Sequence, residues 1–191
     1  QGNKDEADRI LGNCFTMLLL FAVVLTAGLI TFAEPLLLLF GASANTLPYA
    51  LKYMTIYCCG SVFVLITLGL NPFLNAQGFS KFSMTTTILG AVTNIILDPI
   101  FIFVFDMGVA GAATATVISQ SVSAGFVIWF LTKGKKSILK LRLTAMKLNW
   151  KVIGPVLGLG ISAFVMVSTE SILSISFNSS LSRFGGDLAV G

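Results

Sequence analysis

Two acidic residues, Asp98 and Glu170, lie well inside long apolar segments of this 191-residue chain. A charged side chain near the middle of a bilayer costs roughly 2.5 to 3.5 kcal/mol on insertion scales, so each one requires a reason. Asp98 follows Asn94 by four residues, which places both side chains on one face of a helix. Carboxylate and amide oxygens so arranged suit a proton or a small cation. Asp98 and Asn94 are therefore the first candidates for an ion-coupling site.

The polar face around Asp98 continues toward the start of the same segment. One helical stripe is predicted to hold Ser83, Thr87, Gly90, Asn94 and Asp98. The following segment repeats a small residue at every fourth position, and the repeat consists of Gly111, Ala115, Ser119 and Ser123, beside Ala112, Thr116 and Gln120. Small residues on one face permit two helices to approach closely. We therefore expect these two segments to pack against each other.

Two prolines each follow a polar residue inside an apolar segment, in the pairs Asn71–Pro72 and Asp98–Pro99. A proline removes one backbone donor and loosens the preceding turn, which frees a carbonyl for another partner. Asn, Asp and Thr side chains and the freed carbonyls are all oxygen ligands of the kind that hold a proton or a small cation. Taken singly, Asn71, Thr116 and Gln120 are better explained by hydrogen bonds between helices than by ion binding. For Glu170, a functional acid and a buried acid held by neighbouring Ser and Thr hydroxyls both fit.

Composition excludes most other classes of protein. The chain is 55% hydrophobic and 10% charged, with a mean hydropathy of +0.92, far from that of a soluble domain. Histidine is absent, which removes His-based catalytic triads and His metal ligands. The cysteines Cys14, Cys58 and Cys59 show no CxxC spacing. The segment Phe184–Asp187 only approaches a GxGD protease motif and has no second aspartate to complete a catalytic dyad. We expect no enzyme, no cofactor and no nucleic-acid partner.

Five membrane spans are predicted, at 11–33, 53–77, 82–105, 109–131 and 152–177. Ten of the twelve basic residues fall before the first span, after the second, or in the connector 132–151, and only Lys52 and Arg183 fall on the other side. The positive-inside rule then places residue 1 and the connector in the cytoplasm and residue 191 outside. The connector alternates basic and apolar residues, which fits an amphipathic helix at the membrane surface or a solvated linker equally well.

The polar motifs resemble those of one transporter family. NP, NAQG, NxxxDP and GVxGAAxAT occur between Asn71 and Gln120, and residues 159–181 with FGGDLAVG form a second patch. These motifs are similar to helices four to seven of the multidrug and toxic compound extrusion (MATE) transporters. The chain also begins at Gln1 without an initiator Met, which we interpret as an internal loop of a longer protein.

The resemblance implies an all-α polytopic membrane protein with twelve helices in two six-helix lobes. Residues 1–131 would be helices three to six of the N-terminal lobe, 132–151 the cytoplasmic connector between lobes, and 152–191 helix seven and the external loop after it. In the family's first-lobe cation site, an Asp on helix one acts with polar residues that match Asn71, Asn94, Asp98 and Thr116. Glu170 matches an acidic position of the second lobe in some members. Ser162 stands where the family often has proline.

The expected function is that of a secondary antiporter in the plasma membrane, which exports amphiphilic and often cationic compounds in exchange for H⁺ or Na⁺. Its partners would be these small molecules, the lipid bilayer and the remainder of the same transporter chain. The alternative is a flippase for lipid-linked oligosaccharides with a related fold. A flippase would carry basic residues within its spans to hold a diphosphate, and the predicted spans have none in their central parts.

Overall fold

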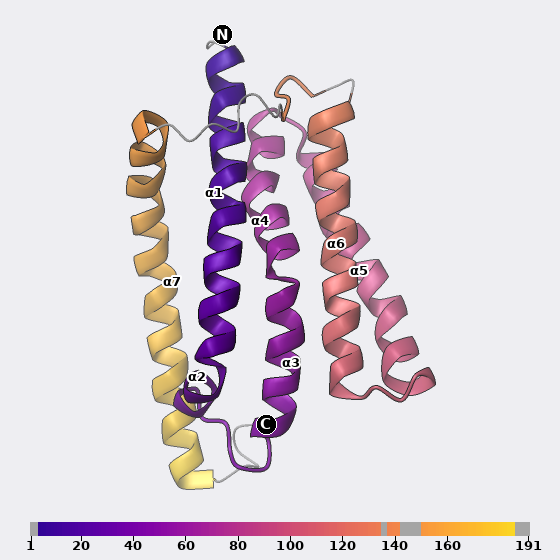
Figure 1. The fold of residues 1–191 in the computed structure, drawn as a ribbon, viewed down its shortest axis with the longest axis vertical. Helices are drawn as coiled ribbons and strands as arrows, with labels where there is room; N and C mark the ends of the chain where they lie inside the picture. Colours follow the sequence, from indigo (N-terminus) through magenta and orange to yellow (C-terminus); the bar gives the residue numbers. More distant parts are fainter. Residues whose placement is uncertain (1–3, 135–136, 142–149, 186–191) are drawn as a thin grey trace.

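The computed structural model describes residues 4–134, 137–141 and 150–185, and this part of the chain is built from helices and their connections. The elements in order are α1 (Lys4–Thr31), α2 (Ala33–Leu39), α3 (Leu47–Cys59), α4 (Ser61–Ala76), α5 (Ser80–Pro99), the π-helix η1 (Ile100–Val104), α6 (Val109–Lys133) and α7 (Trp150–Gly185). The long helices run roughly alongside one another (Figure 1). The predicted all-α architecture is confirmed.

Within the described part of the chain, three helical segments are long and apolar enough to cross a membrane, at Glu6–Thr31, Ser80–Val104 and Val109–Lys133. The bent pair α3 and α4 makes a fourth when it is counted as one span. Helix α7 covers the fifth predicted span and contains the apolar stretch Phe164–Phe177. Much of the apolar surface faces outward; Ile95 is 71% exposed and Phe103 78%. Such exposure suits hydrocarbon rather than water.

The second predicted span is not one straight helix. It begins at Leu47 rather than at residue 53, and it bends by 56° at Gly60 between α3 and α4. Thr26 of α1 donates its hydroxyl hydrogen to the carbonyl of Cys58 at 3.0 Å, at the end of α3. A Cβ atom on Gly60 would clash with Val117 of α6. The bend therefore follows from contacts with α1 and α6, while α4 continues through Pro72.

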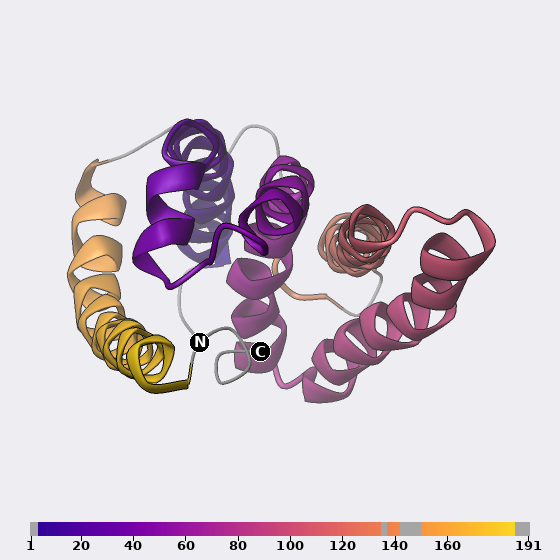
Figure 2. The same ribbon diagram turned by 90° about the horizontal axis from the view of Figure 1, so that it is seen from below.

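Helix α6 lies at the centre of the packing and contacts α3, α4 and α5, while α1 packs against α4. One apolar core joins α1, α4 and α6, and its buried members are Leu11, Phe15, Ile66, Leu70, Leu74, Ala124, Val127, Phe130 and Leu131. Seen from below, α7 and α5 occupy opposite sides of the array (Figure 2). Helix α7 packs mainly against α1.

The most extensive helix–helix contact joins α5 and α6. The predicted small-residue face is buried there, with Gly111, Ala115, Ser119 and Ser123 all shielded from solvent. The hydroxyl of Ser123 donates to the carbonyl of Thr86 at 3.0 Å. A side chain on Gly111 would run into the backbone of Phe101, which lies in η1 directly after α5. The close approach predicted from the small-residue repeat is confirmed.

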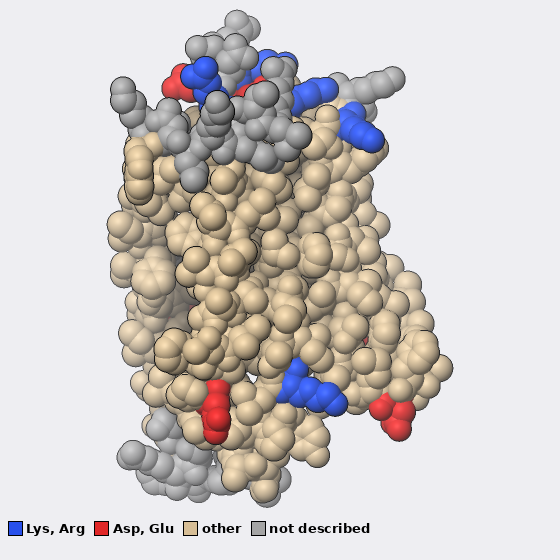
Figure 3. Space-filling view, in the orientation of Figure 1, with Lys and Arg blue, Asp and Glu red and all other residues tan. Residues whose placement is uncertain are grey.

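Charged side chains gather at the two ends of the molecule and leave a band almost free of charge between them on the face shown in Figure 3. Lys and Arg are concentrated at the end where the N-terminus lies (Figures 1 and 3).

Part of the connector, residues 137–141, also packs at this end without forming a helix. Ser137 is 6% exposed, and Leu139 and Leu141 pack against the core. For these five residues neither the amphipathic helix nor the solvated linker is correct. Residues 142–149 of the connector, and residues 186–191 with most of the FGGDLAVG stretch, lie outside the described part.

Candidate functional site

The predicted coupling residues of α5 and α6 come together at the junction of these helices. The amide nitrogen of Asn94 donates to Asp98 Oδ1 at 3.3 Å and lies 3.5 Å from Thr116 Oγ1, which it also contacts as a donor. The Thr116 hydroxyl itself donates to the carbonyl of Ala112 at 2.9 Å. Both contacts of the amide are at the long end of hydrogen-bond distances. Asn94 thus connects the carboxylate on α5 to the hydroxyl on α6 with weak contacts that a ligand can replace.

Asp98 is positioned by the way α5 ends. It occupies the last turn of the helix, directly before Pro99, and the chain continues as the π-helix Ile100–Val104. The backbone N–H of Phe105 donates to the carbonyl of Ile100 at 3.0 Å, which is the five-residue spacing of a π-helix. Short π-helical segments occur frequently at functional sites. The side chain of Asp98 is partly buried, one turn beyond Asn94.

A polar cleft of about 270 Å³ opens beside this group, between α4, α5 and α6. Its lining residues are Thr67, Leu68, Asn71, Thr87, Gly90, Ala91, Asn94, Thr116, Ser119, Gln120 and Ser123. Three of the four predicted coupling residues are among them, and Asp98 is joined to the cleft through Asn94. Since a water molecule takes up about 30 Å³ of liquid, the cleft has room for a small ion with several waters. It is smaller than the ~300 to 1,000 Å³ typical of drug-sized ligands.

Two side-chain oxygens in this cleft have no hydrogen-bond partner within the described chain. They are Oγ1 of Thr67 and Oδ1 of Asn71, which are both buried and lie one turn apart on α4. The sequence motifs point to Asn71 but not to Thr67. The four-residue spacing of Thr67 and Asn71 is visible in the sequence, whereas their lack of partners is a property of the fold alone.

Glu170 does not belong to this cluster. It is exposed on α7, and α7 packs against α1, on the other side of the array from α5 and α6 (Figures 1 and 2). The neighbouring hydroxyls of Thr169 and Ser171 donate to the carbonyls of Val165 and Val167, at 2.9 and 3.2 Å. In the described residues these two hydroxyls donate to the backbone of α7 and not to Glu170, and the role of Glu170 stays a prediction.

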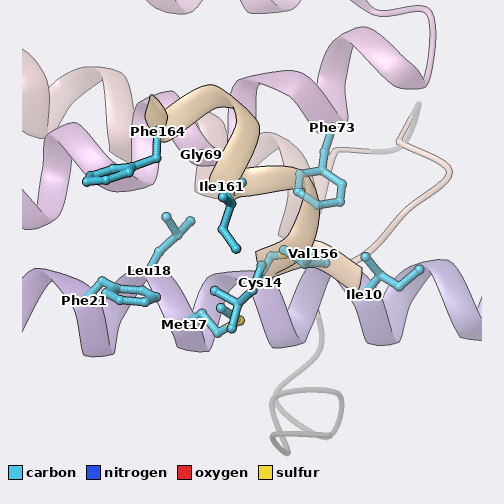
Figure 4. Close-up of a pocket in the computed structure, with 12 residues that line it drawn as sticks. Ile10, Cys14, Met17, Leu18, Phe21, Gly69, Phe73, Val156, Ile161 and Phe164 are labelled. Atoms are coloured by element: carbon cyan, nitrogen blue, oxygen red, sulfur yellow. The ribbon is translucent and has the colours of Figure 1, made fainter. Parts of the chain in front are cut away.

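A larger, apolar cleft of about 620 Å³ lies between α1, α4 and α7 (Figure 4). It is lined by Ile10, Cys14, Met17, Leu18, Phe21, Gly69, Phe73, Val156, Leu157, Gly160, Ile161 and Phe164. Phe21 and Phe164 lie near one end of this cleft, with Ile161 between the helices (Figure 4). Among the described residues no charged side chain lines it, so this cleft suits the apolar body of a ligand.

The oxygen atoms of the polar cleft and of Asp98 beside it come from one carboxylate, amides and hydroxyls. Among the residues that the structure describes, no three His, Cys, Asp or Glu side chains gather into a metal-binding group. Hard oxygen donors of this kind match a proton or Na⁺ and do not match a thiol- or imidazole-binding metal.

Comparisons with known proteins agree with this architecture. Residues 1–100 match the family model MatE. The chain is 30% identical over 163 residues to Multidrug export protein MepA of Staphylococcus aureus (strain bovine RF122 / ET3-1), which covers 85% of this chain and 36% of that protein. The chain thus spans little more than a third of the length of this relative.

Solved structures superpose on nearly the whole chain. One is the inward-facing conformation of a multidrug resistance MATE family transporter of the MOP superfamily, with a TM-score of 0.91 at 25% identity, covering 98% of this chain and 42% of that one. Another is the MATE multidrug transporter DinF-BH, with a TM-score of 0.89 at 38% identity. The match covers 97% of this chain and 41% of that one. The MatE family model matches residues 1–100, which is more than half of this chain. This membrane-embedded helical chain therefore belongs to the MATE family.

Proposed function

We propose that this chain is part of a secondary antiporter that exports amphiphilic, often cationic compounds in exchange for H⁺ or Na⁺. The observation that carries the proposal is the Asp98–Asn94–Thr116 group, a carboxylate, an amide and a hydroxyl held together beside a polar cleft within membrane-spanning helices. Ionisable groups at such depth are costly and typically mark ion pathways. Membership of the MATE family, with relatives named as multidrug export proteins, supports the same function.

The roles of the residues follow from their chemistry. Asp98 would take the proton or supply the charged ligand to Na⁺, while Asn94 orients the carboxylate through its 3.3 Å contact. Asn71 and Thr116 would add neutral oxygens from α4 and α6, the other two walls of the cleft. Binding of a cation neutralises the carboxylate and competes with the amide of Asn94. This competition would loosen the bridge between α5 and α6, which links ion occupancy to helix packing.

The substrate would bind outside the polar cleft, because about 270 Å³ is too small for a drug-sized molecule. The apolar cleft between α1, α4 and α7 is large enough for the apolar part of an amphiphile. Since the chain spans 36% of the MepA relative and 42% of the inward-facing MATE structure, we propose that transport also requires the remainder of the same chain. Glu170 would act as an acidic site of the second lobe, where its partners would come from that remainder.

We propose the domain division and orientation expected from the charge distribution. Residues 1–131 would belong to one lobe, 132–151 to the cytoplasmic connector and 152–191 to the second lobe with its external loop. The concentration of Lys and Arg at the N-terminal end supports a cytoplasmic position of that end in the plasma membrane (Figure 3). The flippase alternative has less support, since no Lys or Arg among the described residues lines either cleft.

The function is tested with the full-length protein in proteoliposomes. A cationic dye is loaded on one side, and a Na⁺ gradient or a pH gradient is imposed separately. We expect dye movement against its own gradient under one of the two ion gradients. Equal dye movement with and without each gradient would exclude an antiporter, and movement of a lipid-linked oligosaccharide would favour the flippase.

A further inference from the structure

Thr67 behaves differently from most threonines in the described helices. Threonine hydroxyls in these helices usually donate to the carbonyl four residues earlier, as seen for Thr85, Thr86, Thr93, Thr114, Thr116 and Thr132. Thr67 is only 7% exposed, yet its hydroxyl has no partner in the described chain. A buried polar atom without a hydrogen bond is destabilising. A bound ligand or the remainder of the full-length chain satisfies this hydroxyl, or the fold carries the cost.

The wall formed by α4 contrasts with the wall formed by α6. On α6, the hydroxyls of Ser119 and Ser123 donate to the carbonyls of Thr116 and Thr86, at 2.8 and 3.0 Å. On α4, Thr67 Oγ1 and Asn71 Oδ1 both lack a partner in the described chain, and both residues line the cleft. These two oxygens are thus concentrated on one wall, one helical turn apart. Both oxygens can accept hydrogen bonds, so they suit a ligand that donates them, such as water bound to a cation.

We propose that Thr67 is a further positioning residue, which with Asn71 binds the water shell of the coupling cation and holds that cation against Asp98. The cleft volume of about 270 Å³ leaves room for a partly hydrated ion between α4 and the Asn94–Thr116 contact. In this arrangement α4 contributes only neutral oxygens. It therefore holds the ion by accepting hydrogen bonds from the bound waters and not by a charge of its own. The proposal rests on the proposed antiport function and assigns the α4 wall a specific part in it.

The test compares Thr67→Val with Thr67→Ser in the full-length protein. Valine has nearly the shape of threonine. When no ion is bound, Thr67→Val removes an unpaired buried hydroxyl, so the melting temperature measured without the coupling ion stays equal or rises. The ion concentration that gives half-maximal gradient-driven dye efflux is expected to increase about fivefold, the loss of roughly one hydrogen bond. Thr67→Ser keeps the hydroxyl and restores the parental ion dependence.

Thr93→Val is the matched control, because the Thr93 hydroxyl is on α5, donates to the carbonyl of Leu89 at 2.7 Å and is not in the cleft wall. It should leave the ion dependence unchanged. Thr67→Ala provides a second variant without the hydroxyl if Thr67→Val is poorly expressed. Parental ion dependence in the valine or alanine variant would overturn the role of Thr67. If Asp98→Asn abolishes the ion response in the same assay, the antiport function stands and only the α4 assignment fails.

Discussion

The side-chain oxygen of Gln77 accepts a hydrogen bond from the Ser137 hydroxyl at 3.1 Å, across 60 residues of sequence. The same oxygen accepts from the backbone N–H groups of Ile138 and Leu139, at 2.9 and 3.0 Å. The amide nitrogen of Gln77 donates to the carbonyl of Phe73 at 3.0 Å, which fixes the side chain. The turn between α4 and α5 therefore holds the first part of the connector against the end of the bundle.

Replacing Gln77 with Ala should release residues 137–141. The backbone N–H groups of Ile138 and Leu139 lose their acceptor, while the Ser137 hydroxyl keeps its shorter contact with the Leu139 carbonyl at 2.6 Å, and we expect a destabilisation of about 1 to 3 kcal/mol. Trypsin added to inside-out vesicles should then cleave after Lys140 several times faster than in the parent protein. Asn75→Ala, at an exposed position beside the same turn, serves as the control. Equal cleavage rates in the two variants would show that the Gln77 contacts do not hold the segment.

The bend at Gly60 depends on close contact with Val117. Gly60→Ala places a methyl group in a clash with the stiff Val117 side chain, and we expect a loss of about 1 to 3 kcal/mol of stability. Val117→Ala in the same chain should recover most of this loss, because it removes the clashing methyl groups. Thermal unfolding in detergent measures both effects. Gly125→Ala, where no atom lies within 4 Å of the new Cβ, should leave stability nearly unchanged. If Val117→Ala does not recover the stability lost in Gly60→Ala, the loss does not come from the clash with Val117.

The proposed orientation is tested by thiol labelling in a version without Cys14, Cys58 and Cys59. Ser137 is a poor position for a probe because it is buried, whereas Ile138 is 57% exposed and Asn45 is exposed between α2 and α3. An impermeant reagent added to intact cells should label Asn45→Cys and leave Ile138→Cys unlabelled until the cells are opened. Labelling of position 138 in intact cells would reverse the orientation.

We expect Thr116 to contribute less to the proposed site than Asp98, since its oxygen lies 3.5 Å from the Asn94 amide and its own hydrogen is donated to the Ala112 carbonyl. Thr116→Val should raise the half-saturating ion concentration about two- to threefold and leave part of the transport intact. Dye efflux at graded ion concentrations measures this effect. Complete loss of ion-driven efflux at normal abundance would mean that Thr116 is a principal ligand.

The sequence predicts those features that depend on neighbours along one helix. The four-residue spacing of Asn94 and Asp98 places them together, and the small-residue repeat from Gly111 to Ser123 predicts the tight contact of α5 with α6; both are observed. The bend at Gly60 and the contacts of Gln77 depend on partners more than 50 residues away. No local spacing encodes such contacts. The missing partners of Thr67 within the described chain are likewise a property of the assembled cleft.

The central claim is that Asp98 couples ion movement to transport, and Asp98→Asn tests it most directly. Asparagine keeps the shape and the contact with Asn94 but removes the titratable charge, so insertion and abundance should match the parent. The measurement is gradient-driven efflux of a cationic dye by the full-length protein in proteoliposomes at equal protein content. We predict that the variant loses the response to the ion gradient. Efflux equal to the parent's, with the same ion response, would contradict the account and make Asp98 a structural acid.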